Sequence, residues 1–194
     1  TIIINYLCLY SSMFIELNNI NPDLVLVTGD RSEMFVACIA SVFQNIPVAH
    51  IQAGDLSGHI DGSVRHAITK LADVHFVASP LAEHRVISMG EDPKMVFNTG
   101  CPSIDLAVDV IKSPQLDFDP FVKYNGLGNS LDISNGYLVV LQHPVTTEFG
   151  NSRKHIETTL LAIEKLGIHT FWFWPNVDAG SDELSKKIRN YRYP

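Results

Sequence analysis

Residues able to bind anions or move protons follow several apolar runs of this sequence. Asp30 and Arg31 follow one run, Gln52 and Asp55 follow the next, and His143 follows a later one. Carboxylates and imidazoles are common general acids and bases, and guanidinium groups bind phosphate. The residue types therefore favour proton transfer on an anionic ligand.

Each of these residues also has a purely structural interpretation. Asp30 can be a helix cap or a first-turn acid, Arg31 a surface cation, and His143 a packed histidine at a strand end. Asp61 is expected to cap a helix and to pair with Arg65 four residues later. Local spacing leaves these alternatives open.

The histidines around residues 50–70 do not have the spacing of a metal site. His50 falls in a predicted strand, His66 in a predicted helix and His75 in the next strand, with His59 between them. Metal-binding motifs place their ligands on one face at fixed spacing, as in HExxH. We therefore predict no metal here.

The segment 53–63 is a candidate ligand loop. It contains Gly54, Gly58 and Gly62 together with acids, and it is long for the ordinary turn that is the alternative. The chain contains neither a GxGxxG nor a GxxxxGK[ST] sequence, so dinucleotide and P-loop fingerprints are absent.

Strand and helix patterns alternate around these residues. Strands are expected at 23–29, 46–54, 74–79, 95–100, 137–143 and 169–175. Helices are expected at 1–14, as a core helix, and at 31–44, 61–72, 80–90, 103–112, 152–167 and 181–190.

This alternation predicts an α/β fold with two Rossmann-like parallel sheets, each covered on both faces. We expect an N-terminal domain over 1–113, a linker over 114–136 within a loop over 113–136, and the start of a second domain over 137–194. Both domains look incomplete. Ligands of such sheets bind beyond the carboxyl ends of the strands, so the candidate residues are expected to line a cleft between the domains.

The composition excludes several classes of protein. The 194 residues are 46% hydrophobic and carry a net charge of −7, which argues against nucleic acid as a partner. Three widely spaced cysteines form neither a disulfide framework nor a zinc pattern, which favours the cytoplasm. The apolar N-terminal stretch has neither the flanks of a signal peptide nor the length of a membrane span.

Several strings together resemble the hydrolysing UDP-N-acetylglucosamine 2-epimerases of sialic or legionaminic acid pathways. These strings are "VTGDR", "HIQAGDLSGHIDGSVRHAITKLADVHF", "NTGCPSID", "LQHPVTTE" and "PNVDAGS". The resemblance implies two domains of the GT-B type and release of N-acetylmannosamine and UDP through a 2-acetamidoglucal. It also implies a UDP-sugar substrate, no cofactor, no membrane contact and a homo-oligomer, dimeric or tetrameric, for the full-length protein.

The resemblance also implies roles for individual residues. The catalytic candidates are Asp30, His143, Asp61 and Asp55. The substrate-binding candidates are Arg31, Gln52, Ser103 and Thr146. Gln52 departs from the glutamate often found in the family, so either it only hydrogen-bonds the ligand or the acid role moves to Asp55. A GT-B glycosyltransferase and an inactive nucleotide-sugar-binding fragment are the alternative functions.

Overall fold

The computed structural model describes residues 2–57, 60–129, 132–176 and 180–191. The chain divides into two compact units, Thr1–Pro114 and Gln115–Pro194. Each unit contains its own parallel sheet.

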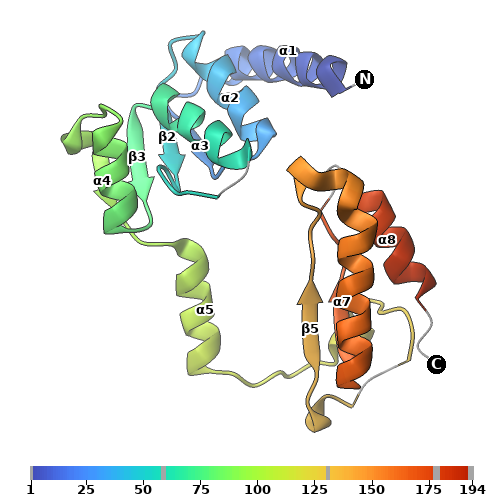
Figure 1. Cartoon of the computed structure of the whole chain (residues 1–194). Helices are drawn as coiled ribbons and strands as arrows, with labels where there is room; N and C mark the ends of the chain where they lie inside the picture. The colour runs from blue at the N-terminus through green and yellow to red at the C-terminus, as the bar shows by residue number, and fades with distance from the viewer. Residues whose placement is uncertain (1, 58–59, 130–131, 177–179, 192–194) are drawn as a thin grey trace. The chain divides into compact units, whose positions relative to one another are not determined.

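The first unit alternates helices and strands in the predicted order (Figure 1). Its strands are β1 (Val25–Thr28), β2 (Val48–Ile51), β3 (Val74–Val77) and β4 (Val96–Asn98). Its helices are α1 (Ile2–Ile20), α2 (Ser32–Val42), α3 (Ile60–Leu71), α4 (Pro80–Ser88), the short 3-10 helix η1 (Pro93–Met95) and α5 (Pro102–Lys112).

The four strands lie in the order β1-β2-β3-β4 and are all parallel. Branched and small apolar side chains from β1, β2, α2 and α3 form one core cluster, which includes Val27, Val48 and Ile68. A second cluster joins β3 and β4 to α4 through Val77 and Val86. These clusters fix the strand ends that carry the candidate residues.

The N-terminal segment is a helix, as predicted, but it is not a core helix. In α1 only Leu17 is buried among the residues whose side chains the structure describes, and Met13 packs partly buried against the first cluster. Apolar side chains on the rest of the helix are exposed, including Leu7 and Ile15 at 62% and 57%. The apolar composition of this helix therefore predicted that its side chains would be buried, but most of them do not pack against the rest of the first unit.

The second unit contains the two parallel strands β5 (Leu138–Leu141) and β6 (Thr170–Phe173). The helices α7 (Ser152–Leu166) and α8 (Ser181–Asn190) pack together through Ile156, Leu160 and Leu184 (Figure 1). The 3-10 helix η3 (Thr146–Asn151) precedes α7.

The prediction that residues 113–136 form a loop was wrong in part. A short helix, α6 (Pro120–Lys123), forms there because Asp119 accepts hydrogen bonds from the backbone N–H groups of Phe121 and Val122. A 3-10 helix, η2 (Ile133–Asn135), follows in the same segment.

Cover on the two sheets differs from strand to strand. In β2 the consecutive residues Val48, Ala49 and His50 are all buried, so both faces of the first sheet are covered there, as predicted, whereas β1 and β5 are partly exposed. Val27 of β1 is buried while its neighbour Leu26 is 58% exposed. Val139 and Leu141 of β5 are likewise 59% and 58% exposed. Alternation of this kind marks strands that are covered on one face only, contrary to the prediction for these two strands.

None of the helices in the described part of the chain is long and apolar enough to cross a membrane.

Candidate active site

The carboxyl ends of β1 and β2 bring Asp30, Gln52 and Asp55 to one edge of the first sheet. Arg65, on α3, connects all three. Its guanidinium forms an ion pair with Asp30 Oδ2 and lies 3.4 Å from Asp55 Oδ2, and its Nη1 also donates to the backbone oxygen of Gln52 at 3.4 Å. This arrangement holds two carboxylates around one cation.

The cluster is shielded but not sealed from solvent. The exposed fractions of the Arg65, Asp30 and Asp55 side chains are 12%, 21% and 31%. The Nε atom of Arg65 is buried, and none of the described residues accepts a hydrogen bond from it. Exposed carboxylate edges beside a fixed guanidinium can accept protons and orient a polar ligand.

The sequence patterns did not single out Arg65 as a site residue. It shares one face of α3 with the buried Ile68 and Thr69, at spacings of three and four residues. An arginine on the inward face of a helix needs acceptors from other elements, and this is the signal that could have identified it.

The structure corrects two predictions for Asp61. It is an exposed residue in the first turn of α3, and the described residues show no capping hydrogen bond to its side chain and no ion pair with Arg65. Arg65 instead turns toward the sheet edge. The resemblance-based assignment of Asp61 as a catalytic residue stays a prediction.

The structure contradicts the helix-cap interpretation of Asp30, because Asp30 does not cap α2. Arg31 occupies the N-cap position of that helix and makes no side-chain cap. Arg31 is 53% exposed and pairs with Glu33 at 3.5 Å. Nothing in this geometry tests phosphate binding by Arg31, which stays a prediction.

The backbone at the end of β2 has an unusual conformation. Gln52 has a φ of 61°, in the left-handed region that few residues other than glycine adopt. Gly54 has a φ of 72°, and a Cβ atom there would lie 2.5 Å from Val86 Cγ2 and 2.9 Å from the Ala82 oxygen. The loop therefore passes so close to α4 that only glycine fits.

His50 is a structural residue beneath this edge. Its Nε2 lies 2.8 Å from the carbonyl oxygen of Gly29 and must donate to it, and its Nδ1 lies 3.2 Å from Thr69 Oγ1. Burial lowers the pKa of His50 to about 4, so the ring is neutral near pH 7. His50 lies directly opposite His75 of β3 in the parallel register.

Cys101 and Ser103 lie at the start of α5, after β4. Cys101 occupies the N-cap position and makes no side-chain cap, and the nearby backbone N–H groups of Ile104 and Ser103 lower the pKa of its thiol. Gln52 Nε2 lies 3.8 Å from Cys101 Sγ, a contact that the sequence patterns did not predict. The Ser103 side chain is exposed.

His143 and Thr146 belong to the second unit, after β5. The His143 ring is exposed, and its Nδ1 accepts a hydrogen bond from the backbone N–H of Asn176 at 3.0 Å. A neutral ring with Nδ1 occupied as an acceptor carries its proton on Nε2. Thr146 is the first residue of η3.

Among the described residues, no three His, Cys, Asp or Glu side chains are arranged to hold a metal ion. Two of the residues considered for that segment, Gly58 and His59, lie outside the described part of the chain.

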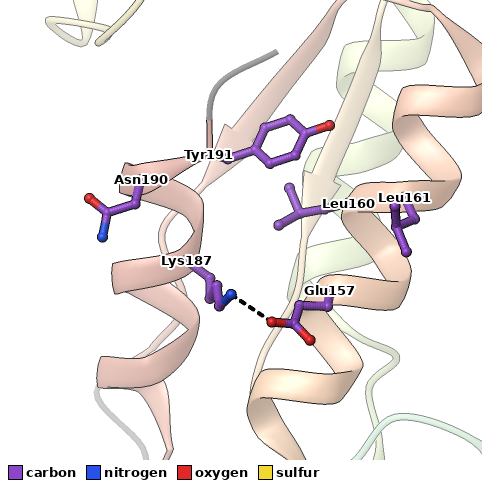
Figure 2. Close-up of a pocket in the computed structure, with 6 residues that line it drawn as sticks. All are labelled: Glu157, Leu160, Leu161, Lys187, Asn190 and Tyr191. Atoms are coloured by element: carbon purple, nitrogen blue, oxygen red, sulfur yellow. Dashed lines mark ion pairs between the residues drawn. The ribbon is translucent and has the colours of Figure 1, made fainter. Parts of the chain in front are cut away.

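Two pockets lie away from the predicted site residues. One, of about 400 Å³, is an apolar groove between α1 and α2. The other, of about 410 Å³, lies between α7 and α8 (Figure 2). In this second pocket Lys187 Nζ approaches a carboxylate oxygen of Glu157 at 2.6 Å, which joins the two helices.

Comparison with known proteins agrees with this architecture. Residues 10–193 match the family model described as UDP-N-acetylglucosamine 2-epimerase. A UDP-N,N'-diacetylbacillosamine 2-epimerase (hydrolyzing) of Legionella pneumophila is 33% identical over 170 residues, which are 88% of this chain and 43% of the relative. A UDP-N-acetylglucosamine 2-epimerase of Neisseria meningitidis is 30% identical over 175 residues, 90% of this chain and 44% of the relative. The chain thus spans less than half the length of these curated relatives.

Solved structures show the same fold. The UDP-GlcNAc 2-epimerase of Neisseria meningitidis bound to UDP-GlcNAc has a TM-score of 0.75 and 19% identity, covering 97% of this chain and 52% of that one. The enzyme of Methanocaldococcus jannaschii in complex with UDP-GlcNAc and UDP has a TM-score of 0.71 and 17% identity, covering 95% and 52%. These similarities confirm the predicted α/β class with parallel sheets of the GT-B type.

Proposed function

The chain belongs to the UDP-N-acetylglucosamine 2-epimerase family, and from this membership we propose that the full-length protein is a hydrolysing epimerase. Its substrate is UDP-N-acetylglucosamine or a related UDP-diacetamido sugar. Its products are UDP and the free 2-epimeric sugar, of the N-acetylmannosamine type, which supply sialic or legionaminic acid synthesis in the cytoplasm. The full-length protein acts as a homodimer or homotetramer.

The observation that carries this proposal is the Arg65 cluster. The guanidinium holds Asp30 and Asp55 at the carboxyl ends of two parallel strands, which is where α/β sheets bind ligands. Epimerisation at C2 needs a base for the C2 proton and a proton donor on the opposite face of the sugar. Two oriented carboxylates with exposed edges supply groups of this kind.

In the proposed reaction a carboxylate removes the C2 proton while the C1–O bond to UDP breaks and its electron pair leaves with the diphosphate. The resulting 2-acetamidoglucal contains a C1=C2 double bond. Water then adds its oxygen to C1, and C2 receives a proton on the opposite face, which inverts that centre. Atoms and charge balance without an external oxidant or reductant.

The tautomer of His143 supports one role for this residue. Its Nδ1 accepts the Asn176 N–H, so a neutral ring offers an Nε2–H donor and no free basic nitrogen. We therefore assign His143 the role of a hydrogen-bond donor, either to the departing diphosphate or to water. Asp30 or Asp55 then removes the C2 proton. Arg31, Ser103 and Thr146 remain candidates for substrate binding, and Asp61 for a further proton-transfer role.

The test is product analysis of the full-length protein with each UDP-sugar, in deuterated water and without an acceptor sugar. The proposal expects UDP, free 2-epimeric sugar and deuterium at C2. Accumulation of the epimeric UDP-sugar would identify a non-hydrolysing epimerase. Turnover that requires an added acceptor would identify the alternative, a glycosyltransferase.

A further inference from the structure

The Gln52 side chain lies between the end of β1 and the start of α5. Its Oε1 is 3.6 Å from the position that a Cβ atom would take at Gly29, and its Nε2 is 3.8 Å from Cys101 Sγ. The backbone is fixed separately, because φ is 61° and the carbonyl accepts from Arg65. The contacts of the Gln52 side chain therefore decide only its own torsion angles.

The environment of Cys101 determines which end of the Gln52 amide faces it. The backbone N–H groups of Ile104 and Ser103, at the start of α5, lower the pKa of the Cys101 thiol. The amide accordingly presents its N–H to the sulfur: Gln52 Nε2, and not Oε1, is the atom that lies 3.8 Å from Cys101 Sγ. A reversed amide would direct Oε1 at a negatively polarised sulfur.

The other end of the amide is then an acceptor without a partner. None of the described residues donates a hydrogen bond to Gln52 Oε1, although Gly29 lies beside it. A partly buried carbonyl oxygen at the edge of a ligand site favours a ligand that brings a donor.

We propose that Cys101 is a positioning residue: it holds the Gln52 amide so that Oε1 accepts a hydrogen bond from the bound sugar. The donor is a hydroxyl or the acetamido N–H of the nucleotide sugar. This inference rests on the proposed function for the identity of the ligand. The Gln52–Cys101 contact itself does not.

The contact is tested first, without any enzyme assay. The pH dependence of iodoacetamide alkylation at Cys101 is followed by peptide mass spectrometry in full-length protein carrying Cys8→Ser, which removes an exposed thiol. Gln52→Ala removes a donor and should raise the midpoint, and Gln52→Glu should raise it further by adding a negative charge. Gln44→Ala, whose side chain bonds elsewhere, should leave it unchanged. Equal midpoints in all four proteins would overturn the proposal.

The kinetic consequence is tested with Cys101→Ala and Cys101→Ser. Loss of one neutral hydrogen bond should raise KM for the UDP-sugar about fivefold in Cys101→Ala, corresponding to ~1 kcal/mol. The Kd of UDP alone should be unchanged, and serine should restore part of the loss. A role in packing alone would lower Tm without this selective rise in KM, and that result would count against the proposal.

The alkylation and kinetic experiments also distinguish a failure of this inference from a failure of the proposed function. A full-length protein that processes no UDP-sugar would refute the function, while the alkylation midpoints would still report the contact. If Cys101→Ala does not fold, Cys101→Ser and the alkylation series still decide the question. Normal KM in both Cys101 variants, despite shifted midpoints, would show that the amide orientation does not serve the ligand.

Discussion

At the level of residues, Arg65 organises the chemistry at the edge of the first sheet. It contacts Asp30, Asp55 and the backbone of Gln52, three positions from two strand ends. Partly buried ion pairs of this kind contribute more to orientation than to stability, because desolvation offsets much of the attraction. The two carboxylates are therefore held in a defined geometry.

Asp30→Asn and His143→Ala in the full-length protein should each lower kcat by two or more powers of ten. This is the usual scale for a general acid or base, or for a donor to a leaving group. For Asp30→Asn the Kd of UDP should change much less, because in the proposed reaction Asp30 acts on the sugar and not on the nucleotide. The two losses should not add, since the proposal places both residues in one reaction sequence.

Two exposed residues provide matched controls for these substitutions. Asp109 pairs only with the nearby Lys112 among the described residues, and His169 is exposed at the surface of the second unit. Asp109→Asn and His169→Ala should retain parental kcat. Near-parental turnover in Asp30→Asn and His143→Ala, combined with lower melting temperatures, would assign both residues to structure alone.

At the level of elements, the connection between β2 and α3 depends on its close approach to α4. Gly54→Ala should lower the free energy of unfolding by about 2 kcal/mol or more. The new methyl group would combine backbone strain at a φ of 72° with overlap onto Val86 and Ala82. Urea unfolding monitored by circular dichroism measures this change.

Gly90 is the matched control, since it has a φ of 96° and no atom lies within 4 Å of the position that a Cβ atom would take there. Gly90→Ala should cost only the backbone strain, about 1 kcal/mol. Equal losses at the two glycines would show that the contact with α4 is not tight.

The buried histidines of β2 and β3 should make the first unit sensitive to acid. The pKa of His50 is about 4 in the folded chain, lowered by burial from 6.5. As pH falls from about 6.5 toward 4, the unfolded chain binds a proton that the folded chain does not. The stability present above pH 6.5 is therefore progressively lost, by up to ~3 kcal/mol for this residue.

Burial also lowers the pKa of His75, which adds a loss of the same sign. His50→Gln removes one of the two titrating groups, so the free energy of unfolding should fall less between pH 7 and pH 4.5. Urea titrations at several pH values test this. The exposed His84, replaced by Gln, should leave the slope unchanged. If His50→Gln lost as much free energy of unfolding between pH 7 and pH 4.5 as the parental protein, His50 would not be a source of the acid sensitivity.

At the level of the whole molecule, the two sheets each expose apolar strand residues. Leu26 in the first unit and Val139, Leu141 and Phe173 in the second are all at least half exposed. The chain also spans 43% and 44% of the two curated relatives described above. Residues 1–194 thus present only part of what those relatives contain.

Residues 1–194 alone should therefore release UDP from a UDP-sugar at least ~100-fold more slowly than the full-length protein. The proposed reaction needs a site that excludes bulk solvent while it positions one water molecule, and such a site depends on closure around the substrate. A coupled assay for UDP measures the rate. Robust UDP release by this segment would refute the prediction.

The sequence alone determined the elements, because hydrophobic period and capping residues act over a few positions. The expected strands and helices all form close to their expected bounds, although α1 continues to Ile20. The exception, α6, had a local signal in Asp119-Pro120 that the surrounding polar residues obscured. The placement of Asp30, Gln52 and His143 after strands followed from the same local patterns.

Only the tertiary structure decided which residues act together. Arg65 contacts Asp30 from 35 positions away, and Gln52 contacts Cys101 across 49 positions. The local pattern favoured Asp61 as the partner of Arg65, but the inward face of α3 directs the guanidinium to the strand ends. Neighbours along a chain are set by its sequence, whereas neighbours across a parallel sheet are set by strand order and register, which short-range periodicity does not specify.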